Sequence, residues 1–201
     1  MPTEKTDKTL EIIHYPHPVL RHKSKPIRRV DAELHQIVRQ MFSRMYDARG
    51  IGLAANQVHL PLRLFVVNLS AEPDEGEEHV FINPVITLPR GSEEMEEGCL
   101  SLPELYGHVR RPKQIRLLAY NLRGQEVRLD LEGMLARVVQ HETDHLDGVL
   151  FPDRMDPAAR EELDYELRDL ESTFQQRRQQ EEIPDDAEIA RELSDWEARY
   201  C

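Results

Sequence analysis

The chain has 201 residues and a net charge of −12, and no stretch of it reaches the ~20 consecutive apolar residues of a membrane helix. This acidity argues against an extended nucleic-acid surface, because phosphate binding needs clustered Lys and Arg. Residues 156–201 contain six Arg against fifteen Asp and Glu, a balance of −9, which leaves −3 for residues 1–155. We expect one domain over residues 1–155 and an acidic helical extension over residues 156–201. The first residues lack the apolar segment of a signal peptide, so we also expect a cytoplasmic location.

The first third of the chain predicts an extended segment, a helix and two strands. Residues 10–27 carry three prolines among scattered apolar side chains, which favours an extended segment along the body. Asp31 is a candidate N-cap for a core helix that stops at Gly50, with apolar residues at helical spacing: Leu34, Ile37, Val38, Met41, Phe42 and Met45. Residues 62–69 and 80–88 are rich in β-branched and aromatic side chains and predict strands.

Two short stretches between these elements carry little side-chain bulk. Residues 50–57 read Gly-Ile-Gly-Leu-Ala-Ala-Asn-Gln, which would let a backbone or ligand approach closely and would equally suit a tight connection. No Gly-Lys-Ser/Thr follows, so the stretch is not a phosphate-binding loop. Further on, Gly98 precedes Cys99, whose thiol is either a small buried hydrophobe or a thiolate metal ligand.

The main chemical motif lies in residues 133–148. It follows residues 115–122 and 126–131, which alternate around Arg123-Gly124 and predict a hairpin. His141 and His145 are four residues apart, so on a helix both imidazoles project from one face, close enough to hold one metal ion. A metal held in this way acidifies a bound water, and the neighbouring carboxylate of Glu142 can take the proton. The motif therefore predicts hydrolase chemistry.

The same helix predicts which of its faces is buried. Met134 and Val138 precede the two histidines on one stripe, so we expect both apolar residues to point inward. Gly148 stands where a left-handed C-terminal cap is common.

The C-terminal residues predict two charged helices. A narrow apolar stripe comprises Leu163, Leu167, Leu170 and Phe174, and Pro184 ends it before a second helix over residues 187–200. We expect a docked helix followed by a solvated end.

A catalytic metal of this kind needs a third protein ligand and an open position. The third histidine of one metalloprotease class would fall at position 151, which is Phe151, so that class is excluded. A downstream glutamate, for instance Glu162 or Glu166, would suit a metallopeptidase of another class, and Cys99 is the remaining candidate. A third interpretation is a non-enzymatic protein with a structural zinc site, although such sites usually have four protein ligands.

Three stretches together resemble the peptide deformylase family: residues 50–57, residues 97–101 (Glu-Gly-Cys-Leu-Ser) and residues 140–148 (Gln-His-Glu-Thr-Asp-His-Leu-Asp-Gly). The resemblance covers residues 10–153. It implies an α+β fold with antiparallel sheets around a central metal-binding helix. The implied activity is removal of the N-terminal formyl group from formyl-methionine of nascent polypeptides, with release of formate.

The resemblance also implies roles for individual residues. Cys99, His141 and His145 would hold the metal, which the resemblance indicates is Fe(II), with Zn, Ni or Co able to occupy the site. Glu142 would act as general base and acid. Gln57 and the backbone N–H of Leu100 would stabilise the oxyanion.

The same resemblance suggests substrate contacts and partners. The backbone at Gly50, Ile51, Gly52 and Gly98 would pair with an extended peptide, and Met134 and Val138 are candidates to line the pocket for its methionine or to be plain core. Residues 104–108 lack an arginine that some family members use to hold the peptide. We expect no membrane or nucleic-acid binding, and any transient ribosome contact to avoid the acidic extension.

Overall fold

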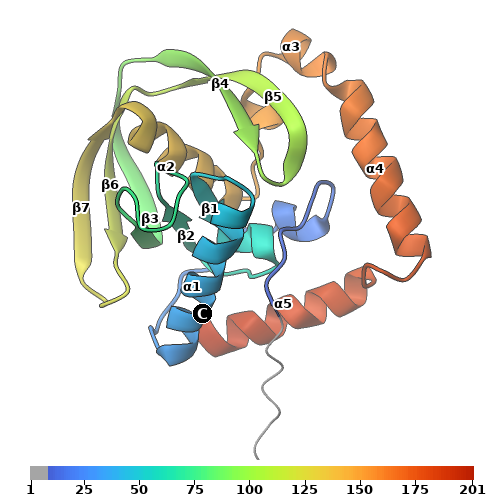
Figure 1. Cartoon of the computed structure of the whole chain (residues 1–201), viewed down its shortest axis with the longest axis horizontal. Coiled ribbons are helices and arrows are strands. Elements are labelled where there is room, and N and C mark those ends of the chain that lie inside the picture. Colours follow the sequence, from blue (N-terminus) through green and yellow to red (C-terminus); the bar gives the residue numbers. More distant parts are fainter. Residues whose placement is uncertain (1–8) are drawn as a thin grey trace, which may run out of the picture.

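The computed structural model describes residues 9–201, which form an α+β body with two antiparallel sheets and a helical C-terminal extension (Figure 1). The larger sheet has the strand order β1-β2-β3-β6-β7, and β4 and β5 form a separate hairpin. The strands are β1 (Gly52–Ala54), β2 (Leu64–Val67), β3 (His79–Arg90), β4 (Glu93–Cys99), β5 (Leu102–Arg111), β6 (Gln114–Tyr120) and β7 (Glu126–Glu132). The helices are α1 (Ala32–Asp47), α2 (Gly133–Leu146), α3 (Pro157–Glu161), α4 (Asp164–Gln179) and α5 (Asp186–Tyr200), with 3-10 turns η1 (Pro18–Arg21), η2 (Ala55–Val58) and η3 (Phe151–Arg154). The predicted fold class is confirmed.

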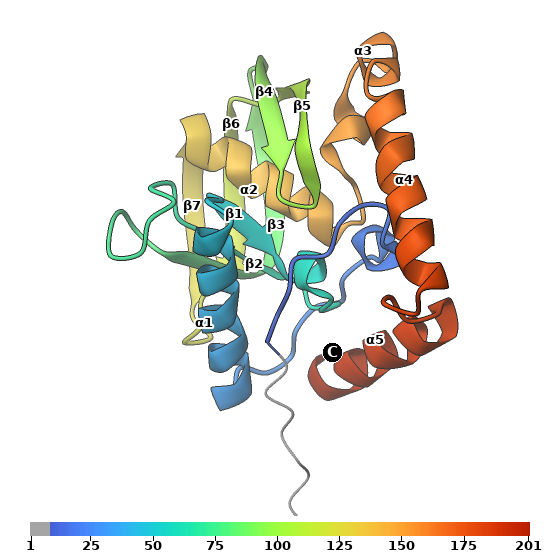
Figure 2. The ribbon, with the colours of Figure 1, turned by 45° about the vertical axis from the view of Figure 1, so that its right-hand side comes forward.

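Helix α2 packs against one face of the five-stranded sheet and contacts β1, β2, β3, β6 and β7 (Figure 2). Successive strand residues point to opposite faces, so Phe65 and Val67 of β2 and Leu117 of β6 reach the same buried cluster as Val139 of the helix. The predicted hairpin is β6–β7. Gly148 has φ 74°, as its predicted capping position requires, and a Cβ there would lie 2.5 Å from a backbone oxygen.

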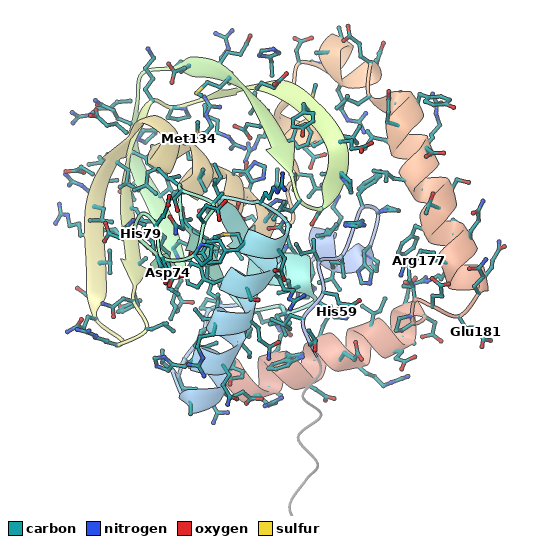
Figure 3. The ribbon with its side chains drawn as sticks, in the orientation of Figure 1. His59, Asp74, His79, Met134, Arg177 and Glu181 are labelled. Carbon is teal, nitrogen blue, oxygen red and sulfur yellow. The ribbon has the colours of Figure 1, made fainter. Side chains whose placement is uncertain are left out.

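The expected inward face of α2 is only partly observed. Val138 is buried, but Met134 is 44% exposed, so the expectation that Met134 points inward is wrong. Met134 lies in the first turn of the helix, and continuous burial begins only at Ala136 (Figure 3). The buried stripe of the helix therefore begins about one turn later than the sequence pattern predicts.

The β4–β5 hairpin was not predicted. Strand β4 contains four glutamates, at positions 93, 94, 96 and 97, which hide any apolar alternation. The hairpin instead buries Leu102, Leu105 and Val109 of β5, in a cluster that also contains Leu150 and Phe151. Its register shifts between Gly98 and Cys99. Such an irregularity re-aims a side chain, and here it occurs at the cysteine.

Helix α1 and the residues before it agree with the sequence pattern. Asp31 caps the helix by accepting the backbone N–H of Leu34 at 2.9 Å, and the six apolar residues predicted for the core are all buried. The helix ends at Asp47, three residues before the predicted stop at Gly50. Residues 10–27, predicted as an extended segment, contain no α-helix, but they turn at Tyr15-Pro16 and again in η1.

Residues 156–201, which we call the C-terminal arm, comprise α3, α4 and α5. Helix α4 runs along one side of the body and α5 turns back toward α1 (Figures 1 and 2). The expectation of a solvated end is wrong, because Tyr200 at the end of α5 is 1% exposed and joins the core cluster that contains α1. Its hydroxyl donates to Asp31 and Glu33. Within residues 9–201, no helix is both long and apolar enough to cross a membrane.

Candidate metal centre

Three predicted ligands converge between β4 and α2. The Sγ atom of Cys99 lies 3.1 Å from Nε2 of His145, which lies 3.2 Å from Nε2 of His141. These residues form the only cluster of three or more potential His, Cys, Asp or Glu ligands within residues 9–201. A tetrahedral centre with bonds of about 2.0–2.3 Å places its donor atoms roughly 3.3–3.6 Å apart, so this donor set fits one metal ion.

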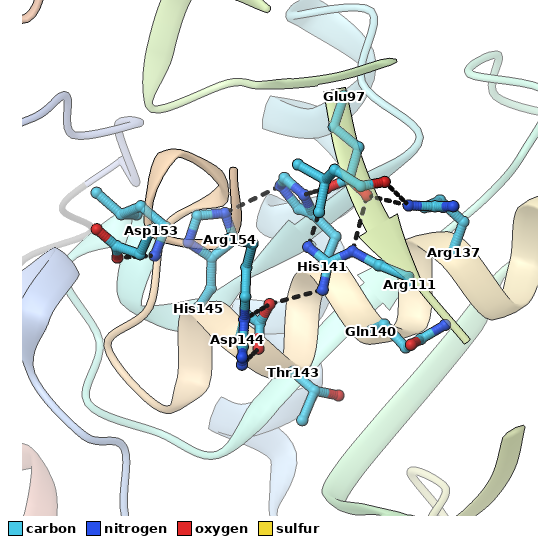
Figure 4. Close-up of polar contacts among 12 residues, drawn as sticks. Glu97, Arg111, Arg137, Gln140, His141, Thr143, Asp144, His145, Asp153 and Arg154 are labelled. Atoms are coloured by element: carbon cyan, nitrogen blue, oxygen red, sulfur yellow. Dashed lines mark hydrogen bonds and ion pairs between the residues drawn. The ribbon is translucent and has the colours of Figure 1, made fainter. Parts of the chain in front are cut away.

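The carboxylate of Glu97 organises the surroundings of His141 (Figure 4). Its Oε1 atom accepts hydrogen bonds from Nε of Arg111 at 2.7 Å and from Nη1 of Arg137 at 2.9 Å. Its Oε2 atom lies 3.0 Å from Nδ1 of His141. With Nδ1 donating to the carboxylate, the lone pair of His141 Nε2 is directed toward Cys99 and His145. Glu97 therefore orients a candidate ligand.

Electrostatics keep Glu97 ionised. Burial raises the pKa of its carboxyl, but the hydrogen bonds from His141 and Arg111 outweigh burial and hold this pKa well below its usual range. Arg137 also donates to the backbone oxygen of Val109 at 2.8 Å, which ties α2 to the β4–β5 hairpin. The two arginines therefore fix both the charge and the position of the carboxylate.

The ion network continues through Asp144 to the surface. Arg111 Nη1 donates to Asp144 at 2.7 Å, and Arg154 Nη2 donates to the other oxygen of Asp144 at 2.6 Å. The sequence pattern predicts no role for Glu97, Arg111, Arg137 or Asp144. The available signal was Arg137, which precedes His141 by one helical turn and therefore shares its face.

Gln57 is buried beside the sulfur. Its Oε1 accepts the backbone N–H of Ala54 at 2.8 Å. The amide NH2 group must therefore face the site, where Nε2 lies 3.5 Å from Cys99 Sγ and 3.1 Å from Ser101 Oγ. The predicted oxyanion donor thus has a fixed orientation. Leu100, between Cys99 and Ser101, has its side chain against Gly50.

Glu142 lies on the buried side of α2, next to β1. A Cβ atom on Gly52 would lie 2.5 Å from Glu142 Oε1 and 2.8 Å from a methyl group of Val138, so glycine is required there. Among the described residues, the buried Oε2 of Glu142 has no hydrogen-bond partner. Burial raises the pKa of Glu142 to about 7, the range in which a carboxyl group exchanges protons readily at neutral pH.

The remaining predicted substrate residues surround this centre. Gly50 and Ile51 precede β1, Ile51 being partly buried against the α2 cluster, and Gly98 precedes the cysteine, with the ring of Tyr106 close to it. Val138 lies beside Gly52, whereas Met134 is exposed at the start of the helix. Of the two pocket candidates, Val138 therefore shares the surroundings of Gly52 with Glu142, whereas Met134 is largely open to solvent.

A cysteine sulfur, two imidazoles and a buried carboxylate on an α+β body are a donor set typical of metal-dependent hydrolases. The family model for polypeptide deformylase matches residues 9–161. The chain belongs to the peptide deformylase family. Its members remove the formyl group from formyl-methionine of nascent peptides, and this chain is an enzyme of that activity.

Individual relatives support the same assignment. The chain is 47% identical to a peptide deformylase of Rhodopirellula baltica over 191 residues, which cover 95% of each protein. It is 47% identical to one from Chlorobaculum tepidum over 160 residues, 79% of this chain and 86% of the relative. The structure of Arabidopsis thaliana peptide deformylase 1B in complex with an inhibitor superposes with a TM-score of 0.80 at 41% identity, covering 84% of this chain and 93% of the other.

Proposed function

We propose that Cys99, His141 and His145 hold the catalytic metal of this deformylase and that Glu142 carries the proton during hydrolysis. The observation that supports this most strongly is the convergence of one sulfur and two nitrogen donors beside a buried carboxylate with an unsatisfied oxygen. When bound, the metal supplies a Lewis acid that polarises the formyl carbonyl and acidifies water.

Groups of the chain itself transfer the proton and stabilise the oxyanion. Glu142 Oε2 accepts a proton from water, and the same carboxyl returns it to the leaving amine, which frees the N-terminus. The NH2 group of Gln57 and the backbone N–H of Leu100 donate to the oxygen on which charge develops, an arrangement that usually contributes the largest catalytic effect.

We infer that the bound metal is Fe(II). One thiolate and two imidazoles suit ferrous iron and zinc alike, so the preference for iron comes from the family, and Zn, Ni or Co can occupy the same donors. A thiolate ligand remains an oxidisable sulfur. An iron-containing form would therefore be sensitive to oxygen.

For the substrate, we propose that the backbone at Gly50, Ile51, Gly52 and Gly98 pairs with the extended peptide. Exposed backbone of this kind binds peptides with little demand on sequence. Val138 is the better candidate for a wall of the methionine pocket, because it lies against Gly52. Met134, being exposed, would contribute only at the rim.

A cytoplasmic enzyme acting on nascent chains would meet the ribosome transiently. We propose that the C-terminal arm does not mediate this contact, because its balance of −9 would be repelled by ribosomal phosphate. We also propose that residues 1–155 form the catalytic domain, with the arm as an accessory element.

The Cys99→Ala variant tests the ligand set against the metallopeptidase alternative. That alternative would use Glu162 or Glu166, both exposed on the arm and neither part of the donor cluster. We expect Cys99→Ala to lose bound metal and formate release, with the variant still folded by circular dichroism. Retained metal together with cleavage of peptide bonds would contradict the proposal. Full function after Glu142→Gln would favour a structural zinc site.

A further inference from the structure

Residues 9–31, which we call the N-terminal segment, make backbone hydrogen bonds to Gln57, the proposed oxyanion donor, and to Ser101. The backbone N–H of Ile13 donates to the carbonyl oxygen of Gln57 at 2.9 Å. Two residues later, the N–H of Tyr15 donates to the carbonyl oxygen of Ser101, also at 2.9 Å. Because the side chain of Gln57 also donates to the hydroxyl of Ser101, the segment closes a ring of hydrogen bonds through two residues that contact the sulfur of Cys99.

The C-terminal arm holds this segment from the other side (Figure 2). The hydroxyl of Tyr15 donates to Oε1 of Glu171 on α4 at 2.6 Å. The ring of His17 meets the ring of Phe174 edge to face, with centroids 5.9 Å apart. Ile13 packs against the buried cluster that contains Leu167 of α4 and against the cluster that contains Ile189 and Leu193 of α5.

Tyr15 links the site to the C-terminal arm, because its backbone N–H donates a hydrogen bond to Ser101 and its hydroxyl donates one to Glu171. We propose that Tyr15 and Glu171 are positioning residues for deformylation, which act through Ser101 to fix the amide of Gln57 where the oxyanion forms. This inference rests on the proposed role of Gln57. It gives the acidic arm a function within its own chain.

The expected effect is on turnover rather than on substrate affinity. An oxyanion donor acts only if it lies about 2.7–3.1 Å from the oxygen of the transition state, so small displacements weaken it. An interaction made mainly in the transition state changes kcat and leaves KM nearly unchanged. Burial, reinforced by the bond to Glu171, raises the pKa of Tyr15 to about 12, so the hydroxyl stays a donor in any ordinary assay.

The test compares single variants of the full-length, metal-loaded enzyme by formate release, with kcat expressed per bound metal. Tyr15→Phe keeps the ring and removes the donor, and Glu171→Ala removes the acceptor. For each we expect kcat to fall about 3- to 10-fold with KM within twofold of wild type, less than the roughly 100-fold cost of deleting an oxyanion donor outright. The double variant should cost no more than the larger single loss, because both changes remove the same bond.

Two controls separate positioning from general destabilisation. Glu171→Gln retains an acceptor for the tyrosine and should restore kcat, and Tyr165→Phe changes a tyrosine of the same helix that is 77% exposed and should leave kcat unaltered. An unchanged kcat in Tyr15→Phe, an altered KM alone, or no rescue by glutamine would overturn the inference. A wild-type enzyme without formate release would instead refute the proposed function.

Discussion

Replacing Glu97 by glutamine removes the charge at the centre of the ion network and keeps nearly the same shape. The carboxylate receives two hydrogen bonds from Arg111 and one each from Arg137 and His141. A glutamine oxygen can keep two of these four, while its NH2 group faces the other donors. Losing two bonds between charged groups, at about 1.5–3 kcal/mol each, predicts a loss of at least about 3 kcal/mol of unfolding free energy.

The assay is thermal denaturation together with metal titration against a competing chelator. At about 2–4 °C per kcal/mol for a chain of this size, Tm should fall by roughly 6–12 °C. Loss of the carboxylate partner of His141 should weaken metal binding about 10- to 100-fold. Glu97→Asp, which keeps the charge, should lose less of both, and Glu96→Gln on the exposed side of β4 is the matched control.

The same variant has a defined pH dependence. The pKa of Glu97 is lowered by folding, so its contribution to stability is present above its unfolded pKa of about 4.3 and is lost as the pH falls below that value. The difference between wild type and Glu97→Gln should therefore be full at pH 7 and shrink below about pH 4. A Tm within 2 °C of wild type at pH 7, with unchanged metal affinity, would refute this role of Glu97.

Three further predictions concern the metal, the glycine beside Glu142 and a buried histidine. Activity should decay faster in air than under anaerobic conditions, because a ferrous-thiolate centre oxidises, and equal decay would count against iron. Gly52→Ala should lower kcat by about 100-fold while the chain stays folded, because its Cβ would lie 2.5 Å from Glu142 Oε1, and wild-type kcat would contradict the described geometry. Burial lowers the pKa of His17 to about 4, so the folded state should lose about 1–3 kcal/mol as the pH falls from about 6.5 toward 4. Urea unfolding should show a flatter profile for His17→Asn, which keeps an acceptor for the N–H of Val19, and identical profiles would contradict this.

The parts of the fold that the sequence predicted are those in which local pattern and burial agree. The core residues of α1 recur at helical spacing. The cap by Asp31 involves only a backbone N–H three residues further along the chain, so both features can be read from the local sequence. His141 and His145 converge because four residues make about one helical turn, a purely local property. Cys99 could be proposed from its flanking residues, but only the folded chain brings its sulfur to the histidines.

The parts that were missed depend on contacts between distant residues. Strand β4 is rich in glutamate, and nothing local distinguishes the buried Glu97 from its exposed neighbours. Its partners Arg111 and Arg137 lie 14 and 40 residues further along the chain. In α5, Ile189, Leu193 and Tyr200 share one buried face, and this spacing is sufficient to predict docking. The abundant charge of the arm favours solvent instead, and by itself it predicts the wrong environment.

The measurement that tests the account most directly is formate release from formyl-Met-Ala-Ser by anaerobically prepared protein. We predict steady turnover by wild type and at least a 100-fold lower rate in Glu142→Gln, which should retain its metal because Cys99, His141 and His145 are unchanged. No formate above the level of the Glu142→Gln variant, in protein shown to be folded and metal-loaded, would contradict the central claim.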